Sequence, residues 1–146
     1  MKTIATLISI VGLSIAAPAF SASVTMTFKN ASTTSSMNVS KVNACGVLSP
    51  TPTSVLQGQT SFSSSTDCGA SASASSVTYT MGTKTCTFGI STIYTAPNYL
   101  FNPPIPGYWT PKAIASGTGG ATCTVVSQDA SKVMTTGAFA AVYSMK

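Results

Sequence analysis

The feature that most constrains the fold is an alternation of apolar and polar residues that recurs along the chain. In Val24–Asn30 the side chains of Val24, Met26 and Phe28 fall on one face, and residues 77–81 repeat this period of two. Such a period places every second side chain on the same side of a β-strand, whereas a helix requires 3.6 residues per turn. No convincing amphipathic helix interrupts these segments. The pattern predicts a chain built from strands.

Turn signals between the alternating segments set the number of strands. Residues 77–81 and 84–93 flank Gly82-Thr83, which is the best hairpin signal in the chain. Cys86, Phe88 and Ile90 share one face of the second segment. Further strands are expected at residues 37–42, 60–63, 121–128 and 137–145, with Phe62 pointing inward. About seven to eight short strands predict a single all-β domain, an antiparallel β-sandwich that is Ig-like or related, with a small β-barrel as the second choice.

Two segments are expected to be irregular. Residues 45–52 contain two prolines and predict a loop. Residues 63–76 are almost all small and polar, a composition typical of a flexible linker, although Cys68 in their middle indicates that the segment is held in place.

The first residues are typical of a secretory signal peptide. Lys2 gives a positive start, residues 4–17 are apolar, and small residues precede a cleavage point after Ser21. The apolar run is shorter than the roughly 20 residues that a membrane span requires. The domain organisation is therefore predicted to be a signal peptide at 1–21 and one domain at 22–146. The expected location is secreted, periplasmic or at the cell surface.

Four cysteines follow the signal segment, at positions 45, 68, 86 and 123. An even number in an exported chain indicates disulfides, with three possible pairings. A zinc site is disfavoured because no Cys-x-x-Cys pair and no histidine are present. Local sequence favours Cys45–Cys68, both in Cys-Gly dipeptides, and Cys86–Cys123, both in strand-like Thr-Cys-Thr triplets.

The composition argues against catalysis. The chain contains no histidine, glutamate or arginine, and its two acids, Asp67 and Asp129, each lie in a turn-like context. General acid–base chemistry and metal sites draw on the residue types that are missing. We therefore expect no enzyme, no metal and no cofactor. The lysines are scattered rather than clustered, so nucleic acid is not an expected partner either.

The stretch from 94 to 111 is the candidate functional segment, because it combines many prolines with aromatic rings. Proline fixes the backbone and removes a donor, so this stretch is expected to form a long, stiff loop. Long ordered loops on a rigid scaffold are where binding tends to occur. The candidate binding residues are Tyr99, Phe101, Tyr108, Trp109 and Lys112. The alternative is that the rings fold back and cap the core, and the sequence leaves both possibilities open.

Two functions from different classes fit these features. The first is a secreted binding module whose aromatic loop contacts a membrane, a glycan or a protein, with Lys112 beside Trp109 suited to an anionic headgroup. The second is a structural subunit of a surface fibre. The alternating Val24–Phe28 segment, Gly137 and Tyr143 resemble features of chaperone–usher pilins, although Tyr143 is not the penultimate residue. That resemblance implies self-association by strand addition at a sheet edge. An extracellular matrix or wall component is a further alternative.

Overall fold

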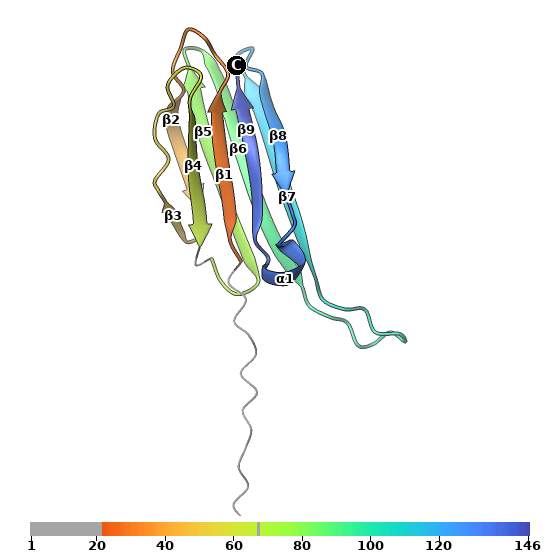
Figure 1. Ribbon diagram of the computed structural model, residues 1–146. Coiled ribbons are helices and arrows are strands. Elements are labelled where there is room, and N and C mark those ends of the chain that lie inside the picture. Colours follow the sequence, from red (N-terminus) through yellow and green to blue (C-terminus); the bar gives the residue numbers. More distant parts are fainter. Residues whose placement is uncertain (1–21, 67) are drawn as a thin grey trace, which may run out of the picture.

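The computed structural model of the protein describes residues 22–66 and 68–146, so the predicted signal peptide and its cleavage point lie outside the described residues. The described chain forms two stacked β-sheets (Figure 1). Its strands are β1 (Val24–Asn30), β2 (Asn38–Ala44), β3 (Val47–Ser49), β4 (Thr60–Thr66), β5 (Ala72–Met81), β6 (Lys84–Thr95), β7 (Tyr108–Thr118), β8 (Cys123–Asp129) and β9 (Phe139–Met145), with one short helix, α1 (Val133–Thr136). The predicted sandwich is confirmed, with nine described strands rather than seven or eight.

The order of the strands places the first strand in the middle of a sheet. One sheet has five strands in the order β3-β4-β1-β9-β8, and the other has four in the order β2-β5-β6-β7. The predicted hairpin is confirmed, since β5 and β6 pair antiparallel around Gly82. Among the described strand pairs, only β1 and β9 run parallel, with Val24 opposite Phe139 and Asn30 opposite Met145.

The core lies between the sheets and follows the alternation in the sequence. Val24, Met26 and Phe28 of β1 are fully buried, as the two-residue period predicts. The ring of Phe28 packs against Tyr79 and Tyr143, with centroids 4.9 and 6.1 Å away. The Tyr143 hydroxyl crosses the core and donates to the carbonyl of Gly89 at 2.6 Å. Burial raises the pKa of Tyr143, so this hydroxyl keeps its proton and remains a donor.

A buried polar residue fixes the far end of β1. Asn30 is fully buried, and its side-chain amide donates to the carbonyls of Ser35 and Val55 at 2.8 and 3.0 Å. Its side-chain carbonyl accepts from the Ser32 N–H at 2.9 Å. Because these bonds satisfy the polar atoms of a buried amide, the residue stabilises the turn that follows β1.

Strand β4 corrects two sequence predictions. Phe62 is exposed rather than inward, and the buried positions of this strand are Ser63 and Ser65. Hydrogen bonding explains the reversal, since Ser63 donates to the Pro50 carbonyl and Ser65 to the Cys45 carbonyl, each at 2.7 Å. Residues 47–49 pair antiparallel with β4 as a short edge strand, where the sequence predicted only a loop.

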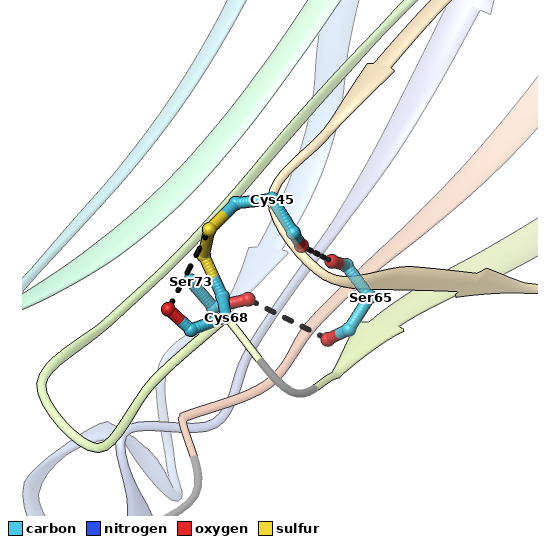
Figure 2. Close-up of a disulfide and its surroundings, with 4 residues drawn as sticks. All are labelled: Cys45, Ser65, Cys68 and Ser73. Carbon is cyan, nitrogen blue, oxygen red and sulfur yellow. Dashed lines mark hydrogen bonds between the residues drawn. A yellow bond between two sulfur atoms is a disulfide. The ribbon is translucent and has the colours of Figure 1, made fainter.

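The disulfide between Cys45 and Cys68 pins the serine-rich segment that resembled a linker. It joins the end of β2 to the connection between β4 and β5. Figure 2 shows the bridge beside Ser65, which donates to the Cys45 carbonyl, and Ser73, which donates to the Ser65 carbonyl. Most of this segment belongs to β4 and β5 rather than to a flexible linker. The expectation that Cys68 holds the segment in place is confirmed by the disulfide.

The second disulfide, Cys86–Cys123, joins the two sheets. Cys86 lies on the inner face of β6 and is fully buried, while Cys123 begins β8 at the edge of the opposite sheet. Both favoured pairings are confirmed, and all four cysteines are bonded. Two disulfides fit an oxidising compartment.

Candidate functional site

The proline-rich stretch forms a loop that projects from one end of the sandwich (Figure 1). Strand β6 continues to Thr95 and β7 begins at Tyr108, so the loop proper covers residues 96–107 and is shorter than predicted. Pro111 lies inside β7, which is tolerated because β7 is an edge strand of its sheet. Within the loop, Asn98 and Ile105 exchange backbone hydrogen bonds of 2.9 and 3.0 Å. The projection is thus an extension of the β6–β7 hairpin.

The base of the loop is a packed aromatic cluster. The rings of Tyr94 and Trp109 lie on paired positions of β6 and β7, with centroids 5.2 Å apart. A Cβ at Gly107 would overlap the Tyr94 hydroxyl, and a Cβ at Gly137 would lie 2.7 Å from the Trp109 ring. Gly137 also has a φ of 70°, which few other residues adopt. These close contacts give the loop a rigid support.

The tip of the loop, defined here as residues 99–101, carries three exposed apolar side chains. Leu100 is 95% exposed, Tyr99 76% and Phe101 57%. The backbone N–H of Leu100 donates to the side-chain carbonyl of Asn98 at 3.0 Å, so a local turn sets the direction of the tip. Ile105 is also exposed on the opposite arm of the loop. Large apolar groups concentrated on a projecting segment are typical of an interaction site.

The structure divides the five candidate binding residues. Tyr99, Phe101 and Tyr108 are exposed, but Trp109 is only 6% exposed and belongs to the core. Trp109 therefore follows the alternative that the sequence left open, in which a ring packs against the core, and it lies outside the exposed surface. The cause is the pleat of β7, which directs Trp109 inward against Tyr94 and Gly137 while its neighbours face outward.

Lys112 also lies away from the tip. It lines a shallow cavity of about 500 Å³ on the outer face of the four-stranded sheet, whereas Trp109 faces the core. The two residues therefore do not form the pair that the sequence suggested. Small side chains at Ala74, Ser76 and Ser91, together with Gly89, line the same cavity.

Sequence reasoning missed Leu100 and Ile105. The search for rings and cations passed over aliphatic side chains, and a proline-rich segment has no two-residue period that separates inward from outward positions. Residues 85–111 contain no lysine and no aspartate, but residues 42–66 are uncharged as well, so the absence of charge does not single out the loop.

The acid in the described part of the chain, Asp129, lies at the end of β8 rather than on the loop. Asp129 is fully exposed, and its carboxylate accepts from the N–H of Ser131 at 2.9 Å. Hydrogen bonds from Ser131 lower the pKa of Asp129 below its usual value. Asp67 lies outside the described residues. Within residues 22–66 and 68–146, no three histidine, cysteine, aspartate or glutamate side chains gather where they could hold a metal ion.

Comparison with known proteins adds no assignment. No protein-family model matches the chain, and a search of curated proteins finds no relative for it.

Proposed function

We propose that the protein is an exported, non-enzymatic β-sandwich that binds a surface ligand, whether membrane, glycan or protein, through the loop between β6 and β7. The observation that carries this proposal is the tip, where the side chains of Tyr99, Leu100 and Phe101 are exposed on a loop that projects from the sandwich (Figure 1). Exposed apolar groups are costly in water and favourable in an interface, so their concentration on one projection supports a role in binding.

The support beneath the tip strengthens the proposal. The Tyr94–Trp109 pair and the exchange of hydrogen bonds between Asn98 and Ile105 hold the two arms of the loop. A loop that is ordered before it meets its ligand loses less conformational entropy on binding. The arrangement therefore suits recognition rather than simple closure of a hairpin, for which two to five residues are enough.

The proposal is tested with a triple variant, Tyr99→Ser with Leu100→Ser and Phe101→Ser. We expect wild type to adsorb to at least one of three probes, phosphatidylcholine vesicles, chitin particles or cellulose particles, and the variant to bind at least tenfold more weakly. Burial of one large apolar side chain contributes about 1.5–3 kcal/mol, and about 1.4 kcal/mol corresponds to tenfold. Adsorption is measured by co-sedimentation.

Phe62→Ser is the matched control for that experiment. Phe62 has the same exposed fraction as Phe101 but lies on β4, away from the loop. The control should bind as wild type does. Equal binding by wild type and the triple variant, or equal loss in the control, would contradict the proposal.

A second candidate function, a structural subunit of a surface fibre, is supported by the position of β1. This strand lies between β4 and β9, runs parallel to β9 and supplies fully buried side chains to the core. An N-terminal strand in such a position can be exchanged between copies, because the β1 of a second copy would make the same pairings. In the structure, β1 completes the sheet of its own chain.

Size-exclusion chromatography with light scattering on residues 22–146 separates the two candidates. We expect a discrete monomer, because β1 already fills its place and Asn30 fixes its end. Polymers that persist on dilution would favour the fibre subunit instead.

A further inference from the structure

The exposed tip has the chemistry of a membrane contact. We propose that residues 99–101 insert into the interfacial layer of a lipid bilayer, which deepens the proposed function and rests on it. The most exposed side chain is the aliphatic Leu100, flanked by Tyr99 and Phe101. Aliphatic groups partition into the acyl region, and tyrosine is enriched where acyl chains meet headgroups.

The same side chains fit a glycan or a protein less well. Glycan binding uses flat aromatic faces together with converging polar groups. Here the most exposed side chain is aliphatic, and the side-chain carbonyl of Asn98 already accepts a hydrogen bond from the Leu100 N–H. A protein partner needs a pocket that surrounds each anchor. A fluid bilayer takes a convex tip of mixed shape without a matching pocket.

The distribution of charge points to the same partner. Residues 85–111 carry no charged side chain, so insertion of the tip brings no ion into an apolar layer. Lys112 lies on the outer face of the four-stranded sheet, and Lys132 beside α1 lies near the exposed carboxylate of Asp129. Attraction to anionic lipids is therefore a minor contribution, and binding should depend on apolar burial.

Three prolines and one pair of backbone hydrogen bonds reduce the number of unpaired backbone donors in the loop. Unpaired N–H groups are costly in an apolar layer, and Pro103, Pro104 and Pro106 have none. Asn98 and Ile105 pair with each other in both directions. Of the helices in the described part of the chain, none is long and apolar enough to cross a membrane. The contact we propose is shallow, about 5–10 Å into the headgroup and acyl boundary.

The test compares Leu100→Asp with Leu56→Asp in co-sedimentation with phosphatidylcholine vesicles. Leu56 is also exposed, but it lies in the turn that bonds to Asn30, the last residue of β1. Strand β1 ends at the opposite end of the sandwich from the loop (Figure 1). We expect Leu100→Asp to lower the partition coefficient roughly tenfold or more, and Leu56→Asp to leave it within about twofold. Both variants should keep the melting temperature of wild type, because both positions are exposed.

Salt and lipid charge provide a second readout. Binding of wild type should change less than about threefold between 0.05 and 0.5 M NaCl, or when about a fifth of the lipid is anionic. A fall of more than tenfold with salt would assign binding to the lysines and overturn the inference.

Fluorescence provides a readout that does not require removal of the apolar side chains at the tip. Tyr99→Trp should show a blue-shifted emission when vesicles are added, because the new ring enters an apolar layer. Trp109 is buried and serves as a constant background in the same spectrum. Unshifted emission with vesicles would contradict insertion.

Failure of the lipid inference is distinguishable from failure of the proposed function. Suppose that wild type does not co-sediment with vesicles, but the triple tip variant loses binding to chitin or cellulose. The loop is then a glycan-binding element and the lipid inference is wrong. If no probe distinguishes the triple variant from wild type, the lipid inference is wrong and the proposed function is overturned for these lipid and glycan ligands.

Discussion

Replacing Trp109 by alanine is expected to lower the free energy of unfolding by about 3–5 kcal/mol, because the change removes a buried indole and leaves a cavity. Trp109 is 6% exposed, and its ring packs against Tyr94 at 5.2 Å. It also contacts Gly137 at the end of α1, so one side chain connects the loop base to the helix. For a domain of this size the melting temperature should fall by roughly 10–20 °C, measured by circular dichroism.

Tyr108→Ala is the matched control, since Tyr108 precedes Trp109 in β7 but is exposed. Its effect on stability should stay below about 1 kcal/mol. Trp109 is the single tryptophan of the chain, so its emission reports this site alone. Blue-shifted emission protected from iodide is expected. A melting temperature unchanged by Trp109→Ala would mean that the indole does not pack as described.

Removing the Cys86–Cys123 disulfide by the double change Cys86→Ala with Cys123→Ala is expected to cost about 3–5 kcal/mol. The bridge closes a segment of 37 residues, for which the chain-entropy relation gives roughly 4 kcal/mol. Cys86 is also fully buried, so the loss of its sulfur leaves unfilled space between the sheets. Guanidinium unfolding followed by circular dichroism measures the change.

The other disulfide provides the comparison. Cys45–Cys68 closes a shorter segment of 23 residues and lies nearer the surface, so its removal by the double change to alanine should cost about 2–3.5 kcal/mol. The expected order of stability is wild type, then the chain without Cys45–Cys68, then the chain without Cys86–Cys123. The reverse order of the two variants would show that joining the sheets matters less than closing the serine-rich segment.

The fold could be predicted from the sequence wherever alternation was clean. Strand β1 matched its predicted bounds, because Val24, Met26 and Phe28 mark the buried face without ambiguity. Strand β4 was misread because its buried positions are serines, whose inward direction depends on carbonyls supplied by Pro50 and Cys45. Such bonds join residues distant in sequence, so a local pattern cannot reveal them.

The sequence was enough to locate the loop, but not to tell which of its side chains are exposed. Prolines and rings were enough to locate the loop, and Tyr99 and Phe101 are exposed as a contact surface requires. The inward direction of Trp109 depends on β7 beginning at Tyr108, and on Gly137 having no side chain where the Trp109 ring packs. Neither condition can be read from the proline-rich segment alone. Leu100, the most exposed of the apolar side chains at the tip, gave no aromatic signal and was passed over.

The parallel pairing of β1 with β9 has a consequence for the order of synthesis. The ribosome delivers β1 first and β9 last, and chains begin to fold from their N-terminal parts. Until β9 is made, β1 pairs only with β4 in its sheet. The backbone groups on the other side of β1 then form an unpaired sheet edge. An open edge of this kind favours pairing with other chains. A chain shortened before Phe139 would therefore be expected to aggregate, although it keeps most of the strands of the finished domain.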